Sequence, residues 1–347
     1  MKTSTQIFLL RIFLLFVLLH CSSCNKVKAT DTIIEKEKRT TIHRASVLES
    51  TDPTIDTADY NKKMLALSNN DKSGRWPVKV KAYPLPGALL PYNRIVAYYG
   101  NLYSKKMGIL GELPKEVMLK KLQSEVLKWQ TADPDVHTIP ALQYIAVTAQ
   151  GSNGKTNRYR LRMPFHQIDI ILNWAKQINA VVFLDVQVGH SSVQEEVSRL
   201  EPYLKLPNVH LAIDPEFSMK NGELPGTKIG SFSSDDINDV IDILTNLVRK
   251  NKLPPKVLVV HRFTQKMVTG YKKIKTVPEV QIVMNMDGFG SKTLKKSTYL
   301  AYIYREPVQF TGFKLFYKND TKSKANGLYT PKELLKFIPK PIYIQYQ

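Results

Sequence analysis

Two stretches near the middle of the chain decide its fold: residues 181–187 read VVFLDVQ and residues 209–217 read VHLAIDPEF. Each is a short run of β-branched and apolar residues, which is typical of a buried strand in a parallel sheet. Six further runs of the same kind occur along the chain. The complete set of predicted strands is 94–100, 142–149, 181–187, 209–217, 257–263, 280–287, 313–317 and 342–346.

Segments with apolar residues at helical spacing separate these strands. In the clearest one, Ser233 or Ser234 can cap a helix whose apolar residues continue to Val248. Eight strands alternating with such segments predict an α/β protein, a (β/α)8 barrel of the TIM type. Because the eighth strand ends the chain, we expect the final helix to be missing, with a helix or strand around 76–90 in its place. The other predicted helices are 114–129, 164–178, 192–204 and 331–338.

Residues 1–24 have the composition of an export signal. Lys2 and Arg11 are their only charges, and the uninterrupted apolar run 12–19 is shorter than the roughly 20 residues that a membrane span needs. Two serines precede Cys24, an ending that resembles the lipobox of bacterial lipoproteins. The resemblance implies a lipidated Cys24 as the mature N-terminus, attached to the bacterial cell envelope. Since Cys21 is the only other cysteine, the body of the protein has no disulfide framework, cysteine metal cluster or catalytic cysteine.

Composition divides the rest of the chain into a polar tether, 25–75, and the predicted barrel domain, 76–347. The domain holds 38 of the 50 basic and 22 of the 30 acidic residues, so it carries most of the formal net charge of +20. Such a surface attracts anionic lipid headgroups or acidic polymers. We expect no nucleic-acid partner, because the sequence contains no recognition module for one, and we expect a monomer.

The alternation of side chains along a strand brings polar residues to one end of the predicted barrel. Successive residues of a strand face opposite sides, and active sites of such barrels lie at the C-terminal strand ends. If the aliphatic residues face the helices, four consecutive strands direct polar side chains inward at that end. Buried carboxylates repel one another, so this cluster favours a functional site. Its members are Asp185, Gln187, Asp214, Glu216, His261, Asn285 and Asp287.

Glycoside hydrolysis is the chemistry that this cluster best supports. One protonated carboxyl group donates a proton to the leaving oxygen, and a carboxylate stabilises the oxocarbenium ion that develops. Glu216 is the predicted donor because it lies furthest along its strand and Asp214 projects from the same face. Asp214, Asp287 and Asp185 complete the predicted catalytic group. The residues predicted to bind the glycan or other small polar substrate are Gln187, His261, Asn285, Tyr99 and Tyr343.

Two resemblances accompany this interpretation. The triplet Asp214-Pro215-Glu216 resembles the end of the strand-four motif of family-18 chitinases, which implies that Glu216 is the acid and that Asp214 orients a substrate amide. The order LDVQ-G, AIDPEF, PGTKIG, VLVVHRF and DGFG, within about 92–320, resembles a group of secreted bacterial lipoproteins without an assigned activity. We also expect the long loop 217–234 to cover the substrate.

Two alternatives stay open at this stage. A divalent cation held by Asp185, His261, Asp287 and either Asp214 or Glu216 would make the protein a metal-dependent hydrolase. No ligand spacing of high specificity supports that reading, so we expect neither a metal nor a cofactor. The second alternative is a non-catalytic lipoprotein that binds a glycan or another solute.

Overall fold

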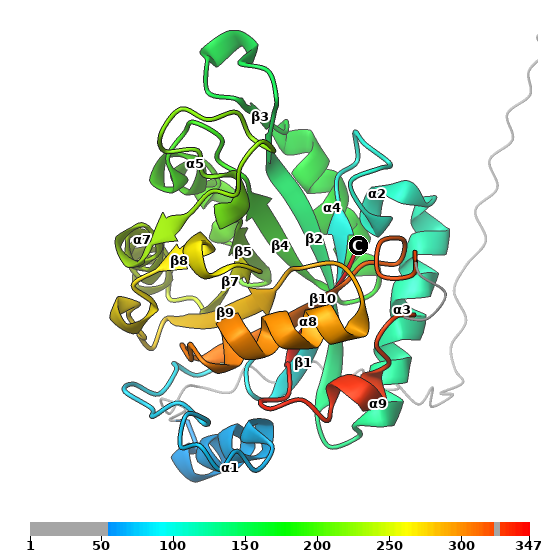
Figure 1. Cartoon of the computed structure of the whole chain (residues 1–347), viewed down its shortest axis with the longest axis vertical. Coiled ribbons are helices and arrows are strands. Elements are labelled where there is room, and N and C mark those ends of the chain that lie inside the picture. The colour runs from blue at the N-terminus through cyan, green and yellow to red at the C-terminus, as the bar shows by residue number, and fades with distance from the viewer. Residues whose placement is uncertain (1–54, 323–326) are drawn as a thin grey trace, which may run out of the picture. The chain divides into compact units, whose positions relative to one another are not determined.

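The computed structural model describes residues 55–322 and 327–347 (Figure 1). The predicted signal, Cys24 and most of the predicted tether lie outside the described residues. Within the described residues, no helix is both long enough and apolar enough to cross a membrane.

Eight parallel strands close a barrel, as the sequence predicts. Each strand pairs with the next one along the chain, and β11 pairs with β1, where Val96 lies opposite Ile344. Every predicted strand is present. The barrel strands are β1 (Asn93–Gly100), β2 (His137–Ala149), β4 (Val181–Val186), β5 (Val209–Ile213), β7 (Lys256–Arg262), β9 (Val280–Met286), β10 (Phe310–Leu315) and β11 (Tyr343–Tyr346).

Helices cover the outside of the barrel. The longest are α3 (Lys115–Ala132) and α7 (Ser234–Asn251). Ser233 begins α7 with a capping box, in which its hydroxyl accepts from the Asp236 amide at 3.2 Å. The others are α2 (Ile109–Glu112), α4 (Phe165–Gln177), α5 (Val193–Arg199), α6 (Glu201–Leu204), α8 (Lys292–Thr298), which continues as the π-helix η5 (Tyr299–Tyr304), and α9 (Pro331–Leu334).

The remaining elements are short. The strand β3 (Arg160–Arg162) extends β2 as an antiparallel hairpin, and β6 (Phe232–Ser233) pairs with β8 (Val268–Thr269). The predicted helix 331–338 is reduced to the single turn of α9, and α8 was not predicted. The 3₁₀ turns are η1 (Gly154–Thr156), η2 (Pro215–Phe217), η3 (Gln265–Met267) and η4 (Tyr271–Lys273).

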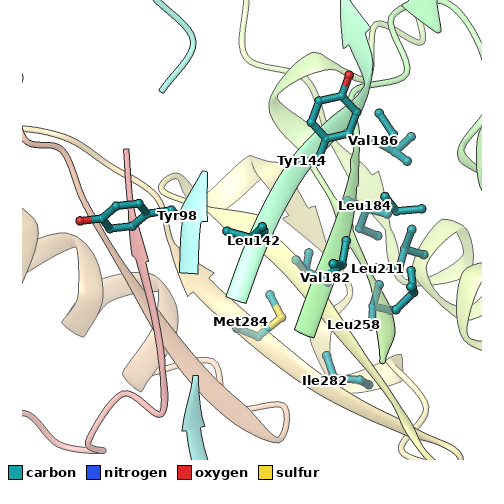
Figure 2. Packing of buried hydrophobic residues seen from close by; sticks show 14 of the residues in the cluster. Tyr98, Leu142, Tyr144, Val182, Leu184, Val186, Leu211, Leu258, Ile282 and Met284 are labelled. Carbon is teal, nitrogen blue, oxygen red and sulfur yellow. The ribbon is translucent and has the colours of Figure 1, made fainter. Parts of the chain in front are cut away.

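The strand side chains form two layers with the predicted alternation. Leu184, Leu211 and Leu258 belong to the cluster between the strands and the helices, part of which Figure 2 shows. Phe183 and Ala212, each one residue away from a member of that cluster, belong to the second cluster, inside the barrel. Leu184, Leu211 and Leu258 therefore face the helices, as predicted, and the residues that alternate with them face the barrel interior.

The helix α1 (Thr57–Ser68) belongs to the folded domain, which corrects the prediction of a tether through residue 75. Tyr60 and Met64 are buried in the inner cluster with strand residues such as Ile95. Asn69, which ends the helix, donates its side-chain amide to the Phe337 carbonyl at 2.9 Å. Figure 1 shows α1 in blue, beyond the N-terminal end of β1.

The segment 76–90 contains no helix or strand, so the prediction of a regular element there is wrong. It runs past the N-terminal ends of the strands, where the Leu90 amide donates to the Gln281 side chain at 3.1 Å. The Trp76 indole donates to the Tyr304 carbonyl at 3.0 Å. The segment 76–90 thus closes the end of the barrel opposite to the predicted site.

Candidate active site

A pocket of about 600 Å³ opens at the C-terminal ends of the barrel strands. This volume lies within the roughly 300–1,000 Å³ of typical small-molecule sites. Of the nine predicted site residues, those that line the pocket are Tyr99, Gln187, Asp214, Glu216 and Asp287. The others are fully buried and do not line it: Asp185, His261, Asn285 and Tyr343.

The turn after β5 directs Glu216 into the pocket. Asp214, the first residue beyond the strand, is 3% exposed, and its carboxyl oxygen accepts from the Glu216 amide at 3.0 Å. This contact caps the 3₁₀ turn η2, whose first residue is Pro215. The Asp-Pro-Glu triplet is therefore a local structural unit as well as a pair of carboxyl groups.

The long loop after η2 is hydrogen-bonded to the backbone of Glu216. The Gly230 amide donates to the Glu216 carbonyl at 2.7 Å. A Cβ at Gly230 would lie 2.5 Å from the Ser218 carbonyl oxygen, a distance that requires the backbone to move. The loop 217–234, predicted to cover the substrate, contributes Phe217 to the pocket wall and supports the turn that carries Glu216.

A buried ion network lies beside and beneath this turn. His261 sits between two carboxylates, with Nε2 at 2.9 Å from Asp185 and Nδ1 at 2.8 Å from Asp287. The Lys314 ammonium approaches the other oxygen of Asp287 at 2.8 Å. All four side chains are at most 5% exposed. Acidic and basic groups therefore alternate through the network, which offsets their repulsion.

This arrangement keeps His261 protonated and Asp287 ionised. Burial alone would lower the pKa of His261, but attraction by Asp287 and Asp185 outweighs it and raises the pKa to about 10. Burial alone would raise the pKa of Asp287, but Lys314 and His261 hold it below the usual range. At neutral pH the network supplies an imidazolium ion and a carboxylate.

The two carboxyl groups of the η2 turn shift in the opposite direction. Burial and the charge of Asp287 raise the pKa of Glu216 to about 7, although Lys314 and His261 partly oppose the shift. Burial raises the pKa of Asp214 well above its usual range, with His261 again opposing. One pocket therefore combines a neutral Asp214, a Glu216 that titrates near neutral pH and an ionised Asp287. Carboxyl groups whose pKa values differ in this way are suited to acid and base roles.

The predicted residues that do not line the pocket form a buried polar layer. Asp185 accepts a hydrogen bond from Gln143, whose side-chain oxygen accepts one from the Tyr343 hydroxyl. Asn285 donates to Gln345 at 3.1 Å. We therefore correct the sequence interpretation: Asp185, Asn285 and Tyr343 occupy the layer beneath the pocket and are not placed to contact a substrate there.

His261 shares that buried position, so its predicted role in substrate binding is also corrected to a positioning role. Gln187 does line the pocket, where it accepts from the Ala149 amide at 3.1 Å and donates to the Tyr99 hydroxyl at 3.3 Å. Tyr99 in turn lies under the Lys314 ammonium, which is 4.0 Å from the ring centroid. The Tyr99 ring therefore binds a cation of the protein itself.

Sequence reasoning missed Lys314 and the aromatic wall of the pocket. Lys314 projects inward because it keeps phase with Phe310, which lies in the inner cluster, whereas Phe313 lies in the outer one. This alternation was available in the sequence, but the predicted strand began only at residue 313. The aromatic residues all lie beyond the C-terminal end of an observed strand, where the strand alternation stops; they are Phe217, Phe263, Phe289 and Phe316.

The metal-dependent alternative does not fit this geometry. Both ring nitrogens of His261 face carboxylates, and the two oxygens of Asp287 face His261 and Lys314. Three of the ligands proposed for a cation thus already neutralise one another; they are Asp185, His261 and Asp287. Within the described residues, no group of three or more histidine, cysteine or acidic side chains is placed to hold a metal ion.

The chain matches no protein-family model and no curated protein. Among solved structures, it is similar to "Cellulase Cel5C_n", with a TM-score of 0.37 and 12% sequence identity. The similarity covers 64% of this chain and 65% of that one, so the chain spans about two thirds of the length of that enzyme.

Proposed function

We propose that the barrel hydrolyses a glycosidic bond with Glu216 as the general acid. The observation that carries this proposal is the environment of Glu216: its pKa is raised to about 7 in a pocket that it shares with an ionised Asp287. An acid that titrates near the working pH is protonated in a large fraction of molecules and still transfers its proton readily.

In this mechanism the protonated Glu216 donates to the leaving oxygen as the glycosidic carbon–oxygen bond breaks. Asp287 stabilises the positive charge that develops on the sugar ring, and Lys314 and His261 keep Asp287 ionised. Water adds to the anomeric carbon and passes its proton to the Glu216 carboxylate, which restores the acid. Asp214 holds the Glu216 backbone through the η2 turn and offers a neutral carboxyl group to the substrate.

The test compares Glu216→Gln with Glu223→Gln, a matched change in the loop after η2, outside the residues that line the pocket. Both proteins are incubated with a glycan panel, and the products are identified by mass spectrometry. We expect Glu216→Gln to lower turnover by about 10²–10⁴-fold, the usual contribution of a general acid, and Glu223→Gln to leave it unchanged. Equal turnover by wild type and Glu216→Gln would remove Glu216 from the mechanism. Saturable binding without any product would instead indicate a glycan-binding protein.

We further propose that the domain is exported and anchored in the bacterial cell envelope through an acylated Cys24. The charge pattern, the apolar run and the serines before Cys24 support this placement, all from the sequence. The intact mass of the mature protein tests it. A species that begins at Cys24 and carries acyl chains is expected, and a Cys24→Ser chain should lack them. A mature wild-type protein without acyl chains would refute the anchor.

A further inference from the structure

The pocket has an apolar wall that the proposed acid–base chemistry does not use. Phe289 and Leu294 both line the pocket, and they are 60% and 55% exposed. Phe289 lies two residues beyond Asp287, so this wall adjoins the ionised carboxylate. Apolar and aromatic side chains that line a pocket are typical of ligand-binding surfaces.

This wall is held rigidly. Phe289 meets the buried ring of Phe316 edge to face, with 5.8 Å between the ring centroids. The next residue, Gly290, donates its amide to Asp320 at 2.9 Å. Asp320 also accepts from the Lys295 ammonium at 2.6 Å and from the Phe316 amide at 2.9 Å. One buried carboxylate thus fixes the loop, the helix and the strand end that build the wall.

Two of the lysines that line the pocket are already paired. Lys295 pairs with Asp320, and Lys314 pairs with Asp287. What Phe289 and Leu294 present to a ligand is therefore an exposed aromatic ring beside an aliphatic side chain. The C–H face of a pyranose ring is a ligand surface of that chemistry, since it is flat and apolar while its hydroxyl groups point outward.

We propose that Phe289, with Leu294 beside it, is the stacking platform of a second sugar subsite, next to the sugar unit held between Glu216 and Asp287. This inference rests on the proposed function and narrows it: the substrate is an oligosaccharide or polysaccharide of at least two pyranose units. A rigid platform binds its ligand with little loss of conformational entropy, which adds to the affinity for the longer glycan.

Binding is measured in the Glu216→Gln background, so that the test does not depend on turnover. Calorimetry is run with cello-, chito- and xylo-oligosaccharides of two to six units. Phe289→Ala is expected to weaken the binding of the recognised oligosaccharide about tenfold, because it removes both the ring and the apolar area that the sugar would cover. Phe289→Trp, which keeps a ring, should restore the affinity.

The matched control is Tyr103→Ala, because Tyr103 is also 60% exposed but lies outside the pocket lining. It should bind as the parent does, and circular dichroism confirms that each variant is folded. Unchanged binding by Phe289→Ala would overturn the subsite without affecting the role of Glu216. Failure of the parent to bind any of the oligosaccharides at millimolar concentration would overturn it too. Phe289-dependent binding in a protein whose wild type cleaves no glycan would support the subsite and reject the proposed hydrolysis.

Discussion

At the scale of single residues, the distance of each carboxyl group from two buried cationic side chains, His261 and Lys314, decides whether that group is ionised. Asp287 contacts both His261 and Lys314 and stays ionised, whereas Glu216 lies in the same pocket and keeps its proton up to about neutral pH. The difference arises from contact distance, because Coulombic attraction at hydrogen-bonding range outweighs the cost of burial. The sequence places Glu216, His261 and Asp287 at the predicted barrel mouth, but it does not reveal Lys314 and does not distinguish the charges of the two carboxyl groups.

A pH titration tests this distribution of charge. Glu216 acts as an acid only when it is protonated, so kcat should fall as the pH rises above about 7. The negative charge of Asp287 raises the pKa of Glu216, and Lys314 and His261 lower it. Asp287→Asn removes the charge that raises it and keeps those that lower it, so the pKa of Glu216 should fall.

The pKa of Glu216 is measured in both proteins by carbon NMR of its side-chain carboxyl group. Asp242→Asn serves as the control, because Asp242 is exposed on α7 and pairs with Lys275 far from the pocket lining. It should leave the titration of Glu216 unchanged. A higher pKa of Glu216 in Asp287→Asn would contradict the assigned network.

At the scale of elements, the loop after η2 is predictable in length but not in its contacts. The glycines and the absence of helical or strand periodicity identify residues 217–234 as a long loop. The hydrogen bond from Gly230 to Glu216 joins residues 14 positions apart, and no local pattern reveals it. Likewise, α8 has few apolar residues at helical spacing; the contacts of Lys295 with Asp320 and the Lys314 carbonyl hold it against the barrel.

Gly230→Ala tests whether this loop positions the acid. An added Cβ would collide with the backbone of the η2 turn, so Glu216 should move and glycan turnover should fall about 10²-fold, as is typical for a displacement of about 1 Å. Gly151→Ala is the control, because nothing lies within 4 Å of its Cβ position. Turnover by Gly230→Ala within a factor of two of wild type would show that the loop does not position Glu216.

At the scale of the whole molecule, the N-terminal segment and the pocket occupy opposite ends of the barrel. The helix α1 buries Tyr60 and Met64 against the inner cluster, while the acidic and basic network fills the other end. From composition alone this helix is assigned to the tether, because residues 25–75 as a whole are mostly polar and charged, although Tyr60, Met64 and Leu67 are large apolar residues. Their burial depends on strand residues that lie far away in the sequence.

A pair of adjacent substitutions separates the two interpretations of α1. Met64 is 4% exposed, whereas its neighbour Leu65 is 62% exposed. If α1 belongs to the domain, Met64→Ala should lower the free energy of unfolding of the whole barrel by about 2–5 kcal/mol, and Leu65→Ala should change it little. Urea denaturation followed by circular dichroism measures both. Equal free energies of unfolding of the two variants would show that α1 belongs to the tether and not to the folded domain.

The sequence by itself determined the strand order, the closed α/β barrel and the inward direction of Asp185, Asp214, His261 and Asp287. These features depend on local periodicity, because one face of each strand must be apolar to pack against the helices. Only the tertiary structure decided which inward residues reach the pocket, which are ionised, and that Phe289 stands exposed beside them. Burial and charge pairing depend on distances between residues far apart in the chain, and those distances exist only once the barrel has closed.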